Sequence, residues 1–118
     1  MHELSICQSL VNTILEEMNK HGGEGVKLVR ARVKMGKLHQ IVPEMLEQAY
    51  HVLIKDTVAD GSVLDVEHVP VVLKCGKCGW QGEMQEMFFR CGSCGSTEVD
   101  VVSGKEMSLE TIEVEREE

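Results

Sequence analysis

The 118-residue sequence predicts an α+β protein: a small mixed β-sheet with two helices, plus an inserted zinc-ribbon module with a four-cysteine zinc site. Apolar residues recur at three- and four-residue steps in 4–20 and 43–56, which is typical of amphipathic helices. Apolar and polar residues alternate in 26–35 and 63–69, which indicates strands. Two Cys-x-x-Cys pairs follow the second strand and indicate the metal-binding ribbon.

The first helix has a long apolar stripe and ends at Gly22-Gly23, where backbone can turn left-handed. The stripe consists of Leu4, Cys7, Leu10, Val11, Ile14, Leu15 and Met18. Because Cys7 lies within the stripe, we expect it to be a buried small apolar residue and not a metal ligand.

In the first strand, one face is apolar from Val29 onward and the other is basic. The apolar face consists of Val29, Ala31, Val33 and Met35, and the basic face of Arg30, Arg32 and Lys34. Asp65 and Glu67 share one face of strand 63–69 and are expected to oppose Arg30 and Arg32. Between these strands, Pro43 suits the first position of the second helix.

The segment 105–115 reads as a last strand, but its apolar residues change parity midway. Met107 and Leu109 share one parity and Ile112 and Val114 the other, which predicts a bulge near Glu110-Thr111. We expect this strand to return to the first sheet. Residues 1–70 and 104–118 would then form one α+β domain, with the ribbon, 71–103, inserted between two of its strands.

Cys75, Cys78, Cys91 and Cys94 form two Cys-x-x-Cys pairs separated by twelve residues. This spacing is typical of a tetrahedral zinc site, and four thiolates leave no open position for catalysis, so the zinc should be structural. Disulfides or redox dithiols are the alternative, but redox Cys-x-x-Cys motifs normally occur singly.

The net charge of −8 argues against nucleic-acid partners, which normally require a basic surface. Trp80, Phe88 and Phe89 are expected to form the small core of the ribbon, although aromatic residues there could also stack on bases. Neither a membrane-spanning stretch nor a signal-peptide pattern is present, and the cysteine usage suits a reducing compartment. We therefore expect a cytoplasmic protein without a membrane partner.

The sequence begins Met1-His2-Glu3, directly before the first helix. A free Met1 amine, the His2 amide and the His2 ring nitrogen can close adjacent chelate rings, with the Glu3 amide or carboxylate as a fourth donor. Such a nitrogen-rich planar set suits Ni(II) or Cu(II) and not tetrahedral zinc. The alternative is that His2 is simply solvated and Glu3 favours the helix N-terminus.

Several motifs occur here in one order: Met1-His2-Glu3-Leu4-Ser5, Gly36-x-Leu38, Val42-Pro43-x-x-Leu46-x-x-Ala49-Tyr50, and the paired Cys-x-x-Cys motifs before a last strand. Together they resemble the HypA/HybF family of nickel-incorporation accessory proteins for [NiFe] hydrogenases. The resemblance implies that His2, with the backbone of Met1 and Glu3, binds nickel transiently and that the four cysteines hold structural zinc. Lys37 stands where the family usually has glutamate.

The resemblance also implies a function and its partners. The expected function is that of a metallochaperone, not an enzyme, delivering Ni(II) for maturation of a hydrogenase large-subunit precursor. A GTPase of the same pathway, and in some organisms urease maturation proteins, would be partners; the protein itself would be a monomer or weak homodimer. The alternative is a zinc-ribbon adaptor in transcription or translation with no nickel role. If His2 is not the nickel ligand, His39 is the next candidate.

Overall fold

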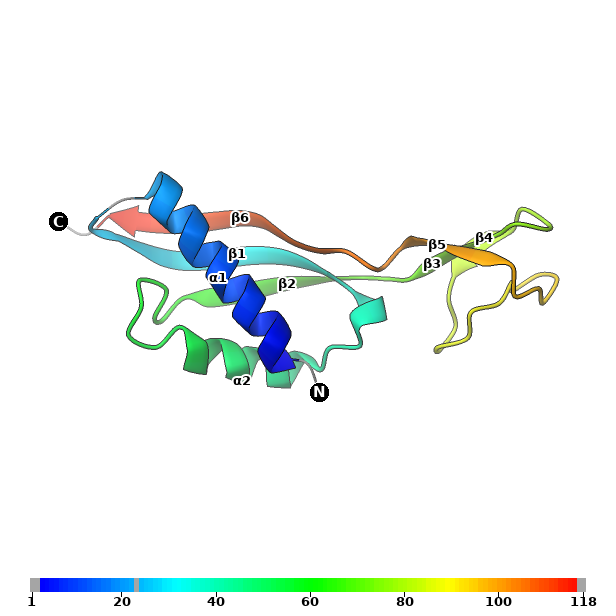
Figure 1. The fold of residues 1–118 in the computed structure, drawn as a ribbon, viewed down its shortest axis with the longest axis horizontal. Coiled ribbons are helices and arrows are strands. Elements are labelled where there is room, and N and C mark those ends of the chain that lie inside the picture. The colour runs from blue at the N-terminus through cyan, green and yellow to red at the C-terminus, as the bar shows by residue number, and fades with distance from the viewer. Residues whose placement is uncertain (1–2, 23, 117–118) are drawn as a thin grey trace. The chain divides into compact units, whose positions relative to one another are not determined.

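The structure is a computed structural model that describes residues 3–22 and 24–116. The described residues form two α-helices and two three-stranded sheets, with strand orders β2-β1-β6 and β4-β3-β5 (Figure 1), which confirms the α+β class. The elements are α1 (Glu3–His21), β1 (Val26–Gly36), the 3-10 helix η1 (Lys37–His39), α2 (Pro43–Leu53), β2 (Val63–Val69), β3 (Val72–Cys75), β4 (Gln81–Glu83), β5 (Val99–Ser103) and β6 (Met107–Arg116).

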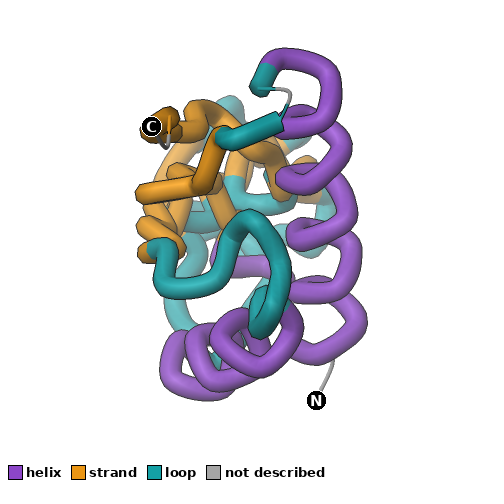
Figure 2. Tube along the Cα trace, turned by 90° about the vertical axis from the view of Figure 1, so that its left-hand side faces the viewer, coloured by secondary structure: helices purple, strands orange, loops and turns teal. Residues whose placement is uncertain are grey.

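The chain forms two compact units. The first consists of Met1–Val33, Ile41–Glu67 and Ser108–Glu118, and the second of Lys34–Gln40 and His68–Met107. In the first unit, α1 crosses one face of the sheet, and α2 lies near the N-terminal half of α1 (Figures 1 and 2).

The buried stripe of α1 confirms the predicted helix but is rotated from the predicted position. Its buried residues are Glu3, Cys7, Leu10, Val11, Ile14 and Met18. Leu4, expected in the stripe, is 59% exposed, because Glu3 takes the buried position one turn before Cys7. Cys7 is fully buried, as predicted, and burial raises the pKa of its thiol to about 11.

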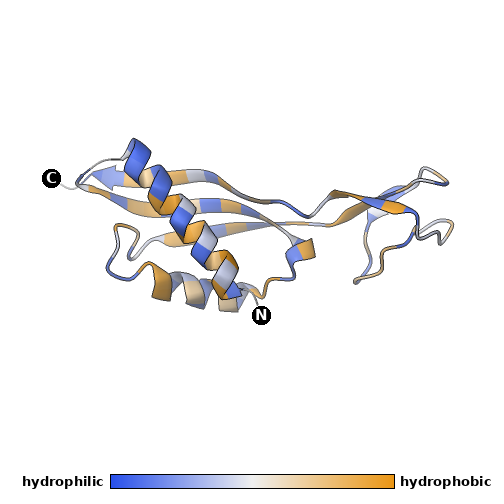
Figure 3. Cartoon of the chain, in the orientation of Figure 1, coloured by the Kyte–Doolittle hydropathy of each residue, from blue (hydrophilic) through white to orange (hydrophobic). Residues whose placement is uncertain are grey.

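Strand β1 changes its buried face partway along. Val26 and Leu28 are buried, and so are Ala31, Val33 and Met35, but Val29 is 39% exposed. The expectation that Val29 faces the core is therefore wrong. Two successive exposed residues, Val29 and Arg30, separate the two buried series, an offset of the kind that a β-bulge produces. Figure 3 shows how hydrophobic and hydrophilic residues follow one another along β1 and the other strands of the first sheet.

The second helix begins at Pro43, as predicted, but ends at Leu53 and not at Asp56. The Ile54 amide still donates to the Tyr50 carbonyl, whereas Asp56 has a positive φ of 64° that ends the helical path. Leu46 and Tyr50 are buried, and the Tyr50 hydroxyl lies 2.6 Å from the Ser62 Oγ. This hydrogen bond fixes the end of α2 to the segment just before β2.

Strand β6 pairs beside β1, as predicted, so the chain returns to the first sheet. Ion pairs cross this sheet: Asp65 lies 3.1 Å from Arg32 and 3.6 Å from Arg30, and Arg30 lies 3.6 Å from Glu113. The pairing of Asp65 with the basic face of β1 is confirmed. These side chains are partly exposed, so each pair contributes at most about 1 kcal/mol. The bulge expected near Glu110-Thr111 stays a prediction.

In the second unit, a turn at residues 36–39 is bound to the segment 104–106. The Gly36 amide donates to Glu106 O at 2.7 Å and the Leu38 amide to Gly104 O at 2.9 Å. The backbones approach so closely that a Cβ on Gly36 would overlap the Gly104 carbonyl. Only glycine fits at position 36, which explains the Gly36-x-Leu38 motif.

The ribbon has a smaller core than expected. Phe88 and Phe89 are 52% and 44% exposed, so the prediction that they form this core is wrong. Leu73 is buried instead, and the half-buried Trp80 indole lies so close to Gly82 and Gly92 that a Cβ at either position would collide with it. The space left by the two glycines accommodates the indole, and the Phe88 and Phe89 side chains remain outside.

Candidate metal sites

The four predicted cysteines lie together in the second unit. Their Sγ atoms are all within 4.8 Å of one another, with 3.8 Å between Cys75 and Cys94 and 3.4 Å between Cys78 and Cys91. A tetrahedral ion with Zn–S bonds of about 2.3 Å requires sulfur separations of roughly 3.8 Å. A disulfide needs about 2.05 Å. The arrangement therefore fits a shared metal ion and not a pair of disulfides.

Each Cys-x-x-Cys pair is a tight turn that directs amide groups at its first sulfur. The amides of Lys77 and Cys78 lie 3.3 and 3.4 Å from the Cys75 Sγ. In the second turn, the amides of Ser93 and Cys94 lie 3.3 and 3.2 Å from the Cys91 Sγ. The two turns thus repeat the same geometry around the two sides of the cluster.

The glycine after each pair makes this turn possible. Gly79 and Gly95 have φ values of 80° and 77°, a region that side chains disfavour. Their amides donate back to the carbonyls of Cys75 and Cys91, at 3.2 and 3.1 Å. These backbone conformations explain why a glycine follows each Cys-x-x-Cys pair.

The amide groups favour the thiolate form at the first cysteine of each pair. The Cys78 amide, followed by that of Lys77, lowers the pKa of Cys75 against the effect of burial. At Cys91 burial raises the pKa, but the amides of Cys94 and Ser93, together with the Cys78 and Cys94 thiols, lower the value overall to about 6. Thiolate is the form that binds metal, and an all-sulfur tetrahedral donor set suits zinc.

The candidate nickel site is described only in part. Met1 and His2 lie outside the described residues. Glu3, the first residue of α1, is 3% exposed, and its Oε2 accepts a hydrogen bond from the Val42 amide at 3.0 Å. Sequence reasoning missed this contact, although the place of Glu3 four residues before Cys7 was a signal for its burial. Glu3 therefore connects the start of α1 to the start of α2.

His39, the second nickel candidate, lies in η1 in the second unit. Its Nε2 is 3.0 Å from the carbonyl oxygen of Lys105, so this nitrogen already has a partner. Among the described residues, the four cysteines are the group of three or more potential ligands that gathers closely enough to hold one ion. His39 is not part of such a group.

None of the described helices is long and apolar enough to cross a membrane.

A sequence model of the family described as "Hydrogenase/urease nickel incorporation, metallochaperone, hypA" matches residues 1–114. A hydrogenase maturation factor HypA from Solidesulfovibrio magneticus is 40% identical over 119 residues, covering 98% of this chain and 100% of the relative. One from Nitrosospira multiformis is 35% identical over 114 residues, covering 97% of each chain.

Solved structures show the same fold. The solution structure of the Ni metallochaperone HypA from Helicobacter pylori has a TM-score of 0.66 at 24% identity, covering 99% of this chain and 100% of that one. A second solution structure of a HypA protein also has a TM-score of 0.66, at 25% identity, and covers 96% of this chain and 95% of that one. The match along the sequence, the shared fold and the four-cysteine cluster agree, and the chain belongs to the HypA family of nickel-incorporation metallochaperones for hydrogenase maturation.

Proposed function

We propose that this chain binds Ni(II) at its N-terminus and delivers it to the precursor of a hydrogenase large subunit. The observation that carries the proposal is the Met1-His2-Glu3 opening in a member of a nickel-incorporation family. The ligands are the His2 ring with the backbone nitrogens of Met1, His2 and Glu3. This donor set suits Ni(II), and nickel is cargo that must be released.

The backbone of Glu3 is favoured over its carboxylate as a nickel donor. One carboxylate oxygen already accepts the Val42 amide, at 3.0 Å, and the side chain is buried. Glu3 is the first residue of α1, and the first amides of a helix make no hydrogen bond within it; the Glu3 amide instead contacts the Glu3 carboxylate itself. A metal can therefore replace the amide proton without breaking a hydrogen bond of the helix.

The four-cysteine cluster has a different task in this proposal. It binds one structural Zn(II), which holds the two turns of the ribbon together, and its closed donor set leaves no position for substrate. Residues 71–103 act as a module inserted into the α+β domain formed by 1–70 and 104–118. The protein is a carrier and not an enzyme; it works in the cytoplasm with a GTPase of the same pathway, and in some settings with urease maturation proteins.

The test compares Ni(II) affinity by isothermal titration for untagged protein, His2→Ala, and a form extended at the N-terminus. Both changes should abolish tight binding, because one removes the imidazole and the other converts the amine into an ordinary amide. His51→Ala is the matched control, since His51 is an exposed histidine on α2 that lies 3.7 Å from Glu47, a helical neighbour four residues earlier. Equal affinity in all four proteins would refute the site and move attention to His39.

A further inference from the structure

Strand β6 is a terminal strand of the first sheet. Because the order is β2-β1-β6, one edge of β6 has no neighbouring strand among the described residues. The strand is ten residues long and contains no proline that would block pairing. A long edge of this kind presents backbone N–H and C=O groups that another strand can bind.

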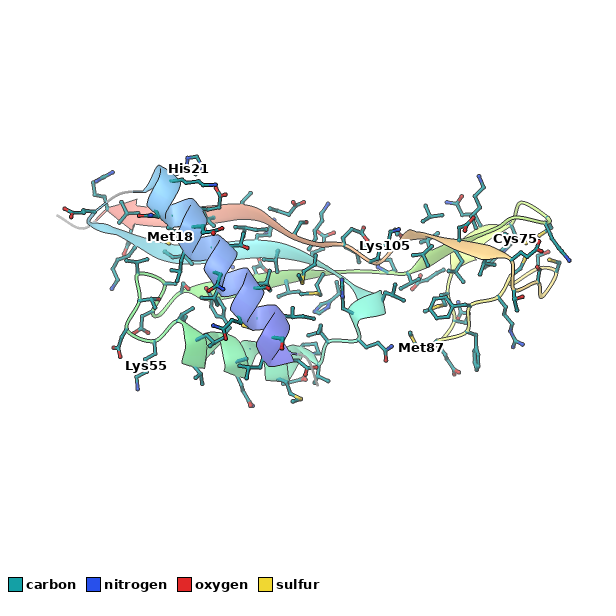
Figure 4. The ribbon with its side chains drawn as sticks, in the orientation of Figure 1. Met18, His21, Lys55, Cys75, Met87 and Lys105 are labelled. Carbon is teal, nitrogen blue, oxygen red and sulfur yellow. The ribbon has the colours of Figure 1, made fainter. Side chains whose placement is uncertain are left out.

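A groove runs between this edge and the C-terminal half of α1. It has a volume of about 320 Å³ and is lined by Thr13, Glu17 and His21 of α1 and by residues 109–112 of β6. Figure 4 shows His21 near the end of α1, above β6. A groove between a helix and a sheet edge is the geometry in which an extended peptide adds as a further strand and places alternate side chains in the groove.

The side chains of the groove define which peptide would fit. Leu109 and Ile112 are half-buried and supply apolar surface, and Glu110 is exposed beside them. From Ser108 to Arg116 the strand has three acidic residues and a single basic one, Arg116, and the whole chain has a net charge of −8. Arg116 is directed at the Glu24 carbonyl, at 3.4 Å, beyond the groove. The edge is therefore acidic with an apolar floor.

This charge argues against a second copy of the chain as the occupant. Two β6 edges that paired with each other would bring the glutamates of both copies together, and like charges on opposed strands are destabilising. We propose that the groove between α1 and the free edge of β6 binds an extended segment of another protein, with apolar and basic residues in alternation, as an added β-strand. This inference does not depend on nickel binding.

The experiment uses the full zinc-loaded chain and three synthetic decapeptides with blocked ends. One alternates lysine and valine, the second alternates glutamate and valine, and the third is the lysine peptide with N-methyl groups on the amides of one edge. Backbone amide shifts and hydrogen exchange locate the binding. The lysine peptide should shift the backbone amide resonances of residues 13–21 and 108–116 and slow hydrogen exchange of the β6 amides. The other two peptides should bind at least about fivefold more weakly.

Charge reversal tests the assignment within the protein. Glu110→Lys should weaken binding of the lysine peptide and strengthen binding of the glutamate peptide, each by about threefold to tenfold. Glu98→Lys, a reversal of an exposed glutamate in the ribbon, is the matched control and should leave both affinities unchanged. Absence of shifts at millimolar peptide, shifts confined to other surfaces, or an unchanged preference in Glu110→Lys would overturn the proposal. Self-association through β6 without peptide would overturn it in favour of a second copy.

Discussion

The side chain of Glu3 has a structural role next to the proposed nickel site. An acidic residue at the start of a helix is ordinarily explained by the helix dipole, and its place beside His2 suggests a metal ligand. In the structure its carboxylate is buried and accepts the Val42 amide at the N-cap of α2. The side chain thus connects α1 to the start of α2, and in the proposed nickel site only the backbone of Glu3 would supply a donor.

This division of roles predicts the effect of Glu3→Gln. A glutamine keeps a carbonyl oxygen for the Val42 amide and keeps the backbone nitrogen, so nickel affinity should remain within about twofold of wild type and the melting temperature should fall slightly. Glu3→Ala should lower the melting temperature further, because the Val42 amide loses its acceptor. Titration and thermal unfolding measure the two effects. Loss of nickel binding in Glu3→Gln would show that the carboxylate is itself a ligand.

Gly36 is the second position where a single residue decides local structure. Gly36→Ala should destabilise the protein by about 2 kcal/mol or more, because the new Cβ overlaps the Gly104 carbonyl and separates the turn at 36–39 from segment 104–106. Gly76→Ala is the matched control, since a Cβ there meets its nearest atom, the Glu98 carbonyl oxygen, at an ordinary 3.5 Å. Urea unfolding compares the two variants, and equal stability would contradict the close approach.

At the scale of elements, the sequence predicted what depends on local pattern. Helix α1, the start of α2 at Pro43, strand β2 and the four cysteines followed from periodicity, proline geometry and ligand spacing. The errors arose where neighbouring elements decide the outcome. Val29 faces outward because β1 changes its buried face after Leu28. In the ribbon, Trp80 packs against two glycines, whereas Phe88 and Phe89 stay exposed.

The folding of the ribbon should depend on the metal that its four cysteines bind. Purified protein should contain about one zinc per chain, and Cys75→Ala or Cys94→Ala should lose both the zinc and the ordered ribbon, because the apparent binding energy of such sites is about 10–16 kcal/mol and is largely folding energy. Cys7→Ala is the control, because Cys7 is buried in α1 and is not one of the four clustered cysteines. Metal analysis and amide exchange give the readout. A ribbon that stays ordered after chelation would contradict a structural metal.

At the scale of the whole molecule, the chain leaves the first sheet after β2, forms the ribbon, and returns as β6 beside β1. The four cysteines thus belong to the second compact unit, whereas Glu3 and the rest of α1 belong to the first. In the function proposed above, the zinc and the nickel are therefore bound by different units of one short chain. This arrangement requires that each unit stay folded when the other unit is disrupted.

Deletion of β6 tests that requirement. Removal of residues 107–116 takes away the strand that pairs with β1, together with the Arg30–Glu113 ion pair at 3.6 Å, and leaves β1 as an unprotected edge. Amide protection should therefore fall in 26–35 and in the helices that pack on the sheet. The four cysteines and the β4-β3-β5 sheet all precede the deletion, so the shortened chain should still bind one zinc per molecule. Unchanged protection in 26–35 would show that β6 does not support the sheet, and simultaneous loss of zinc would show that the ribbon is not an independent module.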